Sequence, residues 1–367
     1  MILLFLLVVL FFLSGIEVCK QKKNSKLSFL LLYIPISLIT ISRFGVGADY
    51  PGYYNAFQEL NSININGISE LLLINAHGEL GYLFLVYLFG KLGLTFYELA
   101  ILIAIVTMPL YYIFFKKYCS YSILSLFIFY AIYFVVYPFN VIRQGLTIAL
   151  FLGVLLPLLF EKKYLLFVIY TILGSLFHYS LLTVLVLPFI LKLKLNIRTI
   201  FILIILGLIF PLGSLILNIG FLNSINVLSY YLDDSSNIYA FLNRAIFIIP
   251  SFYFYAKYDK NSIERKMALI SIIGFLIFIN FRSYSLIASR TTVYFKVVEI
   301  YLLAKYIKDI KLLSNRMLVF NLFSVFLFII FIKAMNTDIT YLKHFGNIPE
   351  YESIINYPIY NNHFHPM

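Results

Sequence analysis

Long apolar runs separated by short basic gaps are the feature that most limits what this 367-residue chain can fold into. Hydrophobic residues make up 62% of the sequence and charged residues 12%, whereas soluble domains carry about 25% charged residues. The bilayer core offers the backbone no hydrogen-bond partners, so such runs must be helices. The composition excludes a soluble globular enzyme and a disordered chain, and it predicts an all-α polytopic membrane protein. The runs lie at about 1–18, 27–42, 95–115, 122–138, 145–160, 164–177, 179–191, 199–220, 243–257, 267–281, 291–304 and 317–334.

Cations in the gaps between the runs set the predicted orientation. Cytoplasmic loops carry an excess of Lys and Arg, and the basic gaps alternate in a way that fits about twelve transmembrane helices with both termini outside. The net charge of +12 is spread over these gaps. A nucleic-acid-binding protein clusters such charge on one polar face, so we expect no nucleic-acid partner.

The segment 80–94 looks helical but does not fit this alternation, because counting it as a crossing inverts every later loop. Gly90, Lys91 and Gly93 also interrupt it. We therefore predict one short interfacial or re-entrant helix on the outer side, with a thirteenth crossing as the alternative. The predicted architecture is a single transmembrane domain over 1–334 with outer loops at 43–78 and 221–242, followed by an outer-face tail at 335–367.

Arginine is the preferred cation on the predicted outer face, whereas lysine dominates the inner gaps. The planar guanidinium suits bidentate binding of phosphate or carboxylate. The outer arginines therefore indicate an anionic ligand there, and snorkelling helix ends are the alternative for any one of them. They are Arg43, Arg143, Arg244, Arg282 and Arg290.

The segment 43–57 begins where a predicted helix ends. Arg43 and Asp49 flank two glycines that allow a tight turn, and either charged residue can face a substrate. Tyr50, Tyr53 and Tyr54 offer flat faces with hydroxyl tips, which suit sugars or the membrane interface. The alternative is a capped loop with an aromatic belt.

Three further clusters place polar side chains at the predicted outer surface. Glu79 opens the odd short helix, where the helix dipole favours a carboxylate. Asn140, Arg143 and Gln144 share one face of a spanning helix, and such polar faces point into the bundle. His178 lies between two apolar runs and is a candidate general acid or base, with a structural hydrogen bond as the alternative.

A last pair, Arg290 and Tyr294, shares one helix face. His363 and His365 are too few for a metal site, and no Cys joins them. The sequence has no Walker loop and no dinucleotide fingerprint. We therefore expect neither a metal nor a cofactor.

These clusters, in this order, resemble the EpsG family of bacterial exopolysaccharide proteins, which is Wzy-like. The resemblance spans roughly residues 30–300. The residues that carry it are Arg43, Gly45, Gly47, Asp49, Tyr50, Glu79, Gly81, Tyr82, Asn140, Arg143, Gln144, His178 and Ser180, with Arg290 and Tyr294 as a weaker match.

The resemblance implies a multi-pass protein of the bacterial cytoplasmic (inner) membrane that polymerises undecaprenyl-diphosphate-linked oligosaccharide repeat units at the outer leaflet. The product is capsule, exopolysaccharide or O-antigen, and undecaprenyl diphosphate is the leaving group. The implied partners are the lipid-linked oligosaccharide, the bilayer, a chain-length regulator and a flippase. Our candidates for catalysis are Arg143, His178, Glu79 and Asp49, and those for substrate binding are Arg43, Tyr50, Tyr54, Asn140, Gln144, Arg290 and Tyr294.

Three other functions compete with this one. A lipid-linked oligosaccharide flippase is expected to show internal symmetry and charges near the helix middles, and the sequence suggests neither. A polysaccharide O-acyltransferase needs a polar path on the inner side, where the gaps show only topology-type lysines. A glycan ligase uses the same leaving group and the same face, and only the motif order favours the polymerase over it.

Overall fold

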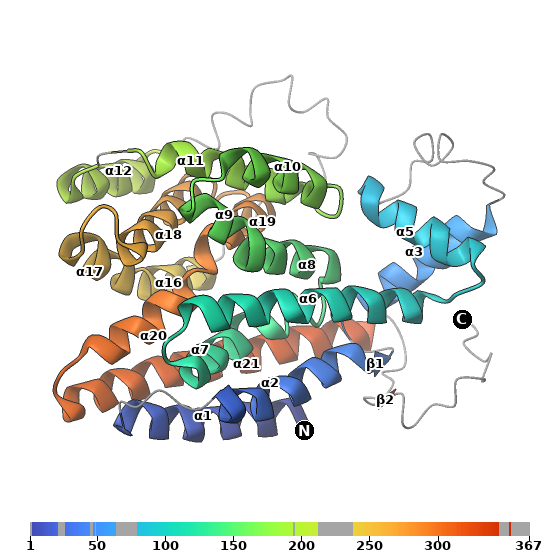
Figure 1. Cartoon of the computed structure of the whole chain (residues 1–367), viewed down its shortest axis with the longest axis horizontal. Helices are drawn as coiled ribbons and strands as arrows, with labels where there is room; N and C mark the ends of the chain where they lie inside the picture. The colour runs from blue at the N-terminus through green and yellow to red at the C-terminus, as the bar shows by residue number, and fades with distance from the viewer. Residues whose placement is uncertain are drawn as a thin grey trace. The chain divides into compact units, whose positions relative to one another are not determined.

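In the computed structural model, the described part of the chain is helical except for one pair of two-residue strands (Figure 1). The backbone contacts divide it into two compact units, described separately here. The first unit comprises 1–153, 176–179 and 310–367, and the second comprises 154–175 and 180–309. The predicted single domain over 1–334 stays a prediction. The structure describes residues 2–20, 26–44, 47, 49–63, 79–193, 195–211, 238–344 and 352–353.

The first unit is built from helices whose apolar faces pack on one another. Helix α6 contacts α2, α5, α7 and α8, and α1 contacts α7 and α21. At the start of α6, Thr95 and Glu98 form a capping box, which satisfies backbone groups that the first turn leaves unpaired. The elements are α1 (Ile2–Lys20), α2 (Lys26–Ile41), β1 (Arg43–Phe44), α3 (Tyr50–Ser62), α5 (Leu80–Lys91), α6 (Phe96–Tyr118), α7 (Ser122–Phe129), η1 (Tyr130–Phe134), α8 (Ile142–Leu150), α21 (Leu313–His344) and β2 (Glu352–Ser353), which pairs antiparallel with β1.

Helices α3 and α5 pack on each other and on α6, near its N-terminal end (Figure 1). Their shared core is aromatic and aliphatic, and it places Tyr53 of α3 against Tyr82 of α5, with ring centroids 5.8 Å apart. Phe96 at the start of α6 closes this core. The cluster therefore fixes the first turns of α3 and α5 beside each other.

The second unit centres on α18, which contacts α11, α12, α17, α19 and α20. Its buried side chains occupy every face of the helix from Met267 onward, as expected of a helix surrounded by others. The elements are α9 (Leu156–Phe160), α10 (Tyr164–Ser175), η3 (Tyr179–Val186), α11 (Leu187–Ile190), α12 (Ile197–Ile209), α16 (Ile238–Phe247), α17 (Ile249–Lys257), α18 (Ile263–Asn280), α19 (Ser285–Lys296) and α20 (Glu299–Asp309). The π-helical turn η2 (Phe151–Leu155) joins α8 to α9.

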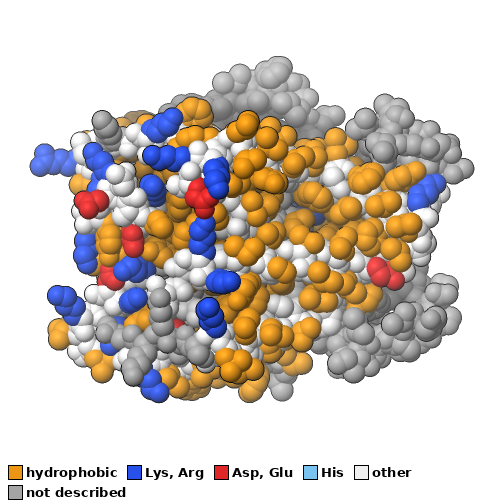
Figure 2. Space-filling view, viewed as in Figure 1, with side chains coloured by type: hydrophobic (Ala, Val, Ile, Leu, Met, Phe, Trp, Pro, Cys, Tyr) orange, Lys and Arg blue, Asp and Glu red, His pale blue; other side chains and the backbone are white. Residues whose placement is uncertain are grey.

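Apolar helices confirm a helical membrane protein, but not the count of twelve crossings. Four helical segments in the described part of the chain are long and apolar enough to span a bilayer: Ile2–Lys20, Phe96–Tyr118, Ile142–Phe160 and Leu313–Asn336. Hydrophobic side chains cover broad areas of the face shown in Figure 2. Helix α5 has 12 residues and is about 18 Å long, which is shorter than the roughly 30 Å hydrocarbon core. Its length agrees with a non-spanning helix.

Several predicted boundaries differ from the structure. The predicted loop 43–78 contains α3, and α21 continues to His344 past the predicted end of its run at 334. Helix α19 starts at Ser285, before the predicted run 291–304, and that run is broken between α19 and α20. The sequence prediction relied on continuous apolar runs. Amphipathic helices such as α3 have no such run and were therefore missed. Most of the predicted loop 221–242 lies outside the described residues.

Candidate functional site

Glu79, Arg143 and His178 come together in the first unit from three distant segments of the chain. Glu79 Oε2 accepts a hydrogen bond from an Arg143 guanidinium nitrogen at 2.5 Å. Glu79 Oε1 lies 2.7 Å from His178 Nδ1 and accepts from the Tyr179 backbone N–H at 3.4 Å. The carboxylate of Glu79 is therefore the centre of the cluster and joins the other two side chains.

The Glu79 carboxylate is held ionised by its neighbours. It is buried, which by itself raises a carboxyl pKa, but the hydrogen bond with His178 and the charge of Arg143 outweigh burial and leave the pKa of Glu79 below its ordinary value. A carboxylate with two such partners is a fixed acceptor. Glu79 is therefore better suited to orienting His178 than to taking up a proton itself.

The Arg143 guanidinium contacts two neighbouring tyrosine rings. Its Cζ atom is 5.2 Å from the ring centroid of Tyr53 and 5.1 Å from that of Tyr82. The cation–π contacts and the bond to Glu79 fix the plane of the guanidinium. Its side chain keeps 21% of its surface exposed, so Arg143 is the open side of the cluster.

The second ring nitrogen of His178, Nε2, is not used in the contact with Glu79. The residue is 7% exposed, and its buried Nε2 has no hydrogen-bond partner among the described residues. A carboxylate at Nδ1 favours the tautomer with the proton on Nδ1, which leaves the Nε2 lone pair to accept. The arrangement can therefore take a proton from a hydroxyl group brought to Nε2.

The first turns of three helices converge on this cluster. Tyr53 lies in the first turns of α3, Tyr82 in the first turn of α5 and Arg143 in the first turn of α8. Helix N-termini carry unpaired N–H groups and partial positive charge, so they attract anions. Neither Asp49 nor Glu79, the N-cap residues of α3 and α5, makes a side-chain cap hydrogen bond to its own helix.

Gly81 locks the start of α5 against the segment that carries His178. The Gly81 N–H donates to the Leu176 carbonyl oxygen at 2.8 Å. A Cβ atom at Gly81 would lie 2.9 Å from that oxygen and from Leu176 Cβ, closer than side chains tolerate. Only glycine therefore allows this close approach, and it brings Glu79 and His178 within reach of each other.

Other predicted residues surround the same region. Arg43 is buried, with its guanidinium 5.5 Å from the Phe139 ring centroid. Asn140 lies against Gly47, where a Cβ atom would collide with its side chain, and Gly47 has a positive φ of 120°. Gln144 is buried in α8 one residue after Arg143.

The predicted site residues of the segment 43–57 differ in their structural positions. Asp49 is the N-cap of α3. Tyr50 is buried and meets Phe96 edge to face at 5.1 Å, and Tyr54 is partly buried against the same core. The tyrosine of this segment that contacts Arg143 is Tyr53. Tyr82, which also contacts Arg143, was not predicted to bind substrate.

Arg290 and Tyr294 belong to the second unit. Both lie within α19, and the buried Tyr294 hydroxyl is 3.0 Å from Ser180 Oγ. Ser180 follows His178 by two residues in the chain. Among the described residues, no group of three or more His, Cys, Asp or Glu side chains is placed to hold a metal ion.

Sequence reasoning missed a second buried charged cluster, in the second unit. Glu299 is 4% exposed, accepts from Ser271 Oγ at 3.3 Å and interacts electrostatically with Lys296 and Arg244. Lys296 Nζ donates to the Asn243 side chain at 3.3 Å. Lys296 ends α19 and Glu299 begins α20, so these buried charges lie at helix ends and not near helix middles. The sequence does contain a signal for this cluster, because Lys296 and Glu299 are opposite charges three residues apart inside the apolar run 291–304.

The sequence matches the EpsG family over residues 26–352. No curated protein and no solved structure matches the chain. The match covers nearly the whole chain and, with the apolar helices, assigns it to the membrane proteins of polysaccharide biosynthesis, with a polymerase-like function connected to exopolysaccharide. The chain belongs to the EpsG family.

Proposed function

We propose that this protein polymerises undecaprenyl-diphosphate-linked oligosaccharide repeat units into a surface polysaccharide at the outer leaflet of the bacterial cytoplasmic membrane. The observation that carries the proposal is the contact of Glu79 with both Arg143 and His178. It joins a phosphate-binding group to a proton acceptor. Glycosyl transfer from a lipid diphosphate needs both at one place.

The donor diphosphate binds at the open side of Arg143. Negative charge develops on the diphosphate as its bond to the sugar breaks, and fixed positive charge stabilises it. The first turns of α3, α5 and α8 add their N–H groups and dipoles to the guanidinium. Arg43, Asn140 and Gln144 line the same region and orient phosphate or sugar oxygens.

His178 is the general base, and Glu79 is its positioning residue. The acceptor hydroxyl forms a hydrogen bond to Nε2, and its oxygen attacks the anomeric carbon of the donor chain. The carbon–oxygen bond to the diphosphate breaks, the diphosphate keeps the electron pair, and the hydroxyl proton passes to His178. The transition state is oxocarbenium-like, as in other glycosyl transfers. Asp49 is the remaining candidate base. Arg290 and Tyr294, in the second unit, stay predictions for substrate binding.

No nucleotide sugar enters this reaction, because the diphosphate bond of the donor supplies the driving force. A flippase must deliver repeat units to the outer leaflet, and a chain-length regulator fits as a partner of a processive polymerase. The lysine-rich gaps support the orientation, since they favour the cytoplasmic side. Sugar contacts are assigned to the tyrosines of the segment 43–57, including Tyr50 and Tyr54.

The test is the glycan profile of cells that lack the protein, complemented by wild type, Arg143→Ala, Arg143→Lys or the control Arg198→Ala. Arg198 is exposed and lies on the predicted inner side. Null cells should accumulate single repeat units on the lipid carrier at the outer face. Wild type and Arg198→Ala should restore long chains. Arg143→Ala should not, although its protein level is unchanged.

The alternatives give different profiles. Full chains that stay on the lipid carrier in null cells indicate a ligase. Single units trapped at the cytoplasmic face indicate a flippase, and full chains without an acyl group indicate an acyltransferase. Wild-type chain length with Arg143→Lys would contradict the planar, bidentate role of the guanidinium.

A further inference from the structure

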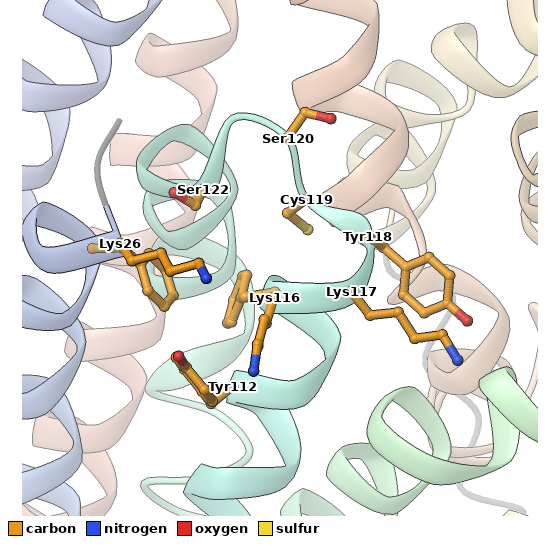
Figure 3. Close-up of a pocket in the computed structure, with 10 residues that line it drawn as sticks. Lys26, Tyr112, Lys116, Lys117, Tyr118, Cys119, Ser120 and Ser122 are labelled. Atoms are coloured by element: carbon orange, nitrogen blue, oxygen red, sulfur yellow. The ribbon is translucent and has the colours of Figure 1, made fainter. Parts of the chain in front are cut away.

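A basic cavity lies at the opposite end of α6 from helices α3 and α5 (Figure 3). Its volume is about 210 Å³, and it lies wholly within the first unit. Figure 3 shows Lys26 at the start of α2, Lys116 and Lys117 at the end of α6, and Ser120 and Ser122 on the segment that leads into α7. Phe29, Tyr112, Phe115, Tyr118 and Cys119 complete the lining.

The lining carries positive charge without a balancing carboxylate. Three of its ten residues are lysines, and none is Asp or Glu. Within the part of the chain that the structure describes, neither Lys26 nor Lys116 forms an ion pair, and both are exposed. The cavity therefore attracts an anion.

The helix dipole favours two of these lysines but not the third. Lys116 and Lys117 occupy the last turn of α6, where a cation is favoured by the helix dipole. Lys26 is the first residue of α2, where the dipole is positive and a cation is disfavoured. An anion shared between Lys26 and Lys116 removes this repulsion.

The polar and aromatic groups of the lining match a phosphate with an organic substituent. The hydroxyls of Ser122 and Tyr112 can donate to phosphate oxygens. Ser122 also opens α7, whose first turn is held by the Glu17 carboxylate through the Leu124 backbone N–H at 2.8 Å. The rings of Phe29 and Phe115 supply an apolar wall.

Exposed apolar residues next to the cavity distinguish a lipid from a free phosphate. Leu27 follows Lys26 and is 66% exposed, Leu31 lies one turn further and is 65% exposed, and Ile113 follows Tyr112 and is 41% exposed. Such side chains suit contact with acyl chains. A free phosphate makes no use of them.

We propose that this cavity binds the phosphate headgroup of an anionic phospholipid from the cytoplasmic leaflet. Lys26 and Lys116 hold the phosphate from two helices, Tyr112 and Ser122 donate to it, and the acyl chains extend along the apolar surfaces of α2 and α6. Basic pockets between membrane helices on the cytoplasmic side bind such headgroups. The site is separate from Glu79 and Arg143, and it does not depend on the reaction proposed there.

The experiment uses the purified full-length protein in a neutral detergent. Its thermal unfolding midpoint is followed during titration with short-chain phosphatidylglycerol, with phosphatidylcholine of the same chain length, or with inorganic phosphate. The variant Lys26→Gln/Lys116→Gln is compared with Lys260→Gln/Lys311→Gln. The control removes two exposed cytoplasmic-side lysines from outside the cavity, so the change in net charge is the same.

Phosphatidylglycerol should raise the midpoint of wild type and control saturably, and the cavity variant should need about 30-fold more of it. The single variants Lys26→Gln and Lys116→Gln, each expected to show about a fivefold shift, serve if the double variant does not fold. An equal loss in the control, or an equal response to phosphatidylcholine, overturns the site. Equal stabilisation by inorganic phosphate overturns the lipid assignment.

Discussion

The two units each bury a carboxylate among cations, at Glu79 and at Glu299, but the surroundings of these carboxylates differ. Glu79 lies at the first turn of a helix, and its partner Arg143 keeps an open side. Glu299 starts α20 amid packed helices, and its neighbour Arg244 is buried against Phe278, with its guanidinium 4.0 Å from the ring centroid. The first cluster can receive a ligand, whereas the second holds its charges inside the unit.

The difference shows what burial alone says about a charged group. Removing one partner of a buried ion cluster strands the others at a high energetic cost. That cost should be low at Glu79, where Arg143 keeps solvent contact and two tyrosine rings, and high at Glu299. The same substitution should therefore act on chemistry in one unit and on stability in the other.

The largest effect is expected from His178→Gln, which keeps a polar side chain but removes the proton acceptor. Chain synthesis should fall by about 10²–10⁴-fold, the usual contribution of a general base, while the protein stays folded. Polymerisation by membranes carrying the variant, normalised to protein level, measures this. Synthesis within twofold of wild type would remove His178 as the base.

Glu299→Gln should destabilise the protein by about 3–5 kcal/mol, because it leaves Lys296 and Arg244 without their carboxylate. Adding Lys296→Met should recover part of this loss, because one stranded charge is removed. Unfolding in detergent measures both, with the exposed Glu59→Gln as the control. A stable Glu299→Gln protein that fails to bring repeat units to the outer face would instead assign this cluster to transport.

Gly81→Ala should reduce chain synthesis about tenfold without changing any reactive group. The added methyl group displaces Leu176 and with it His178, and small misplacements cost up to about 10²-fold in rate. Gly15→Ala in α1 is the matched control, since a Cβ atom at Gly15 would meet only the Phe320 ring at an ordinary contact distance of 3.5 Å. Equal activity of the two variants would show that the Gly81–Leu176 contact does not position the base.

The smallest expected effect is the pH dependence of the stability that Glu79 contributes. Because the pKa of Glu79 is lowered in the folded protein, its ionised form contributes stability above the unfolded value of about 4.3, and this is lost as pH falls through the folded value. The difference in unfolding midpoint between wild type and Glu79→Gln should therefore shrink below about pH 4. A difference that stays constant there would contradict the lowered pKa.

The sequence predicted the helical membrane class and the family, and the comparisons confirm both. It also selected Glu79, Arg143 and His178, which the structure brings into contact, although their roles stay a prediction. It did not predict that Glu79 joins the other two. That contact depends on packing between segments 64 and 99 residues apart in the chain, which local pattern does not encode.

The contact of Tyr53 with Arg143 was missed for a different reason. Tyr50, Tyr53, Phe57 and Leu60 repeat at helical spacing and form the buried face of α3. Reading 43–78 as a loop hid this period. A helical reading would have directed Tyr53 inward, toward Arg143. The charges at Lys296 and Glu299 were hidden in the same way, because an apolar average conceals single polar residues that are costly in a membrane.

The helix N-termini that converge near Arg143 determine how the proposed diphosphate site responds to external pH. Peptide N–H groups do not titrate, a guanidinium keeps its proton in proteins, and the Glu79 carboxyl is biased toward ionisation. On the orientation we propose, this anchor faces the external medium, whose acidity the cell does not control. Its binding of a diphosphate is thus set by geometry and not by the acidity of the medium.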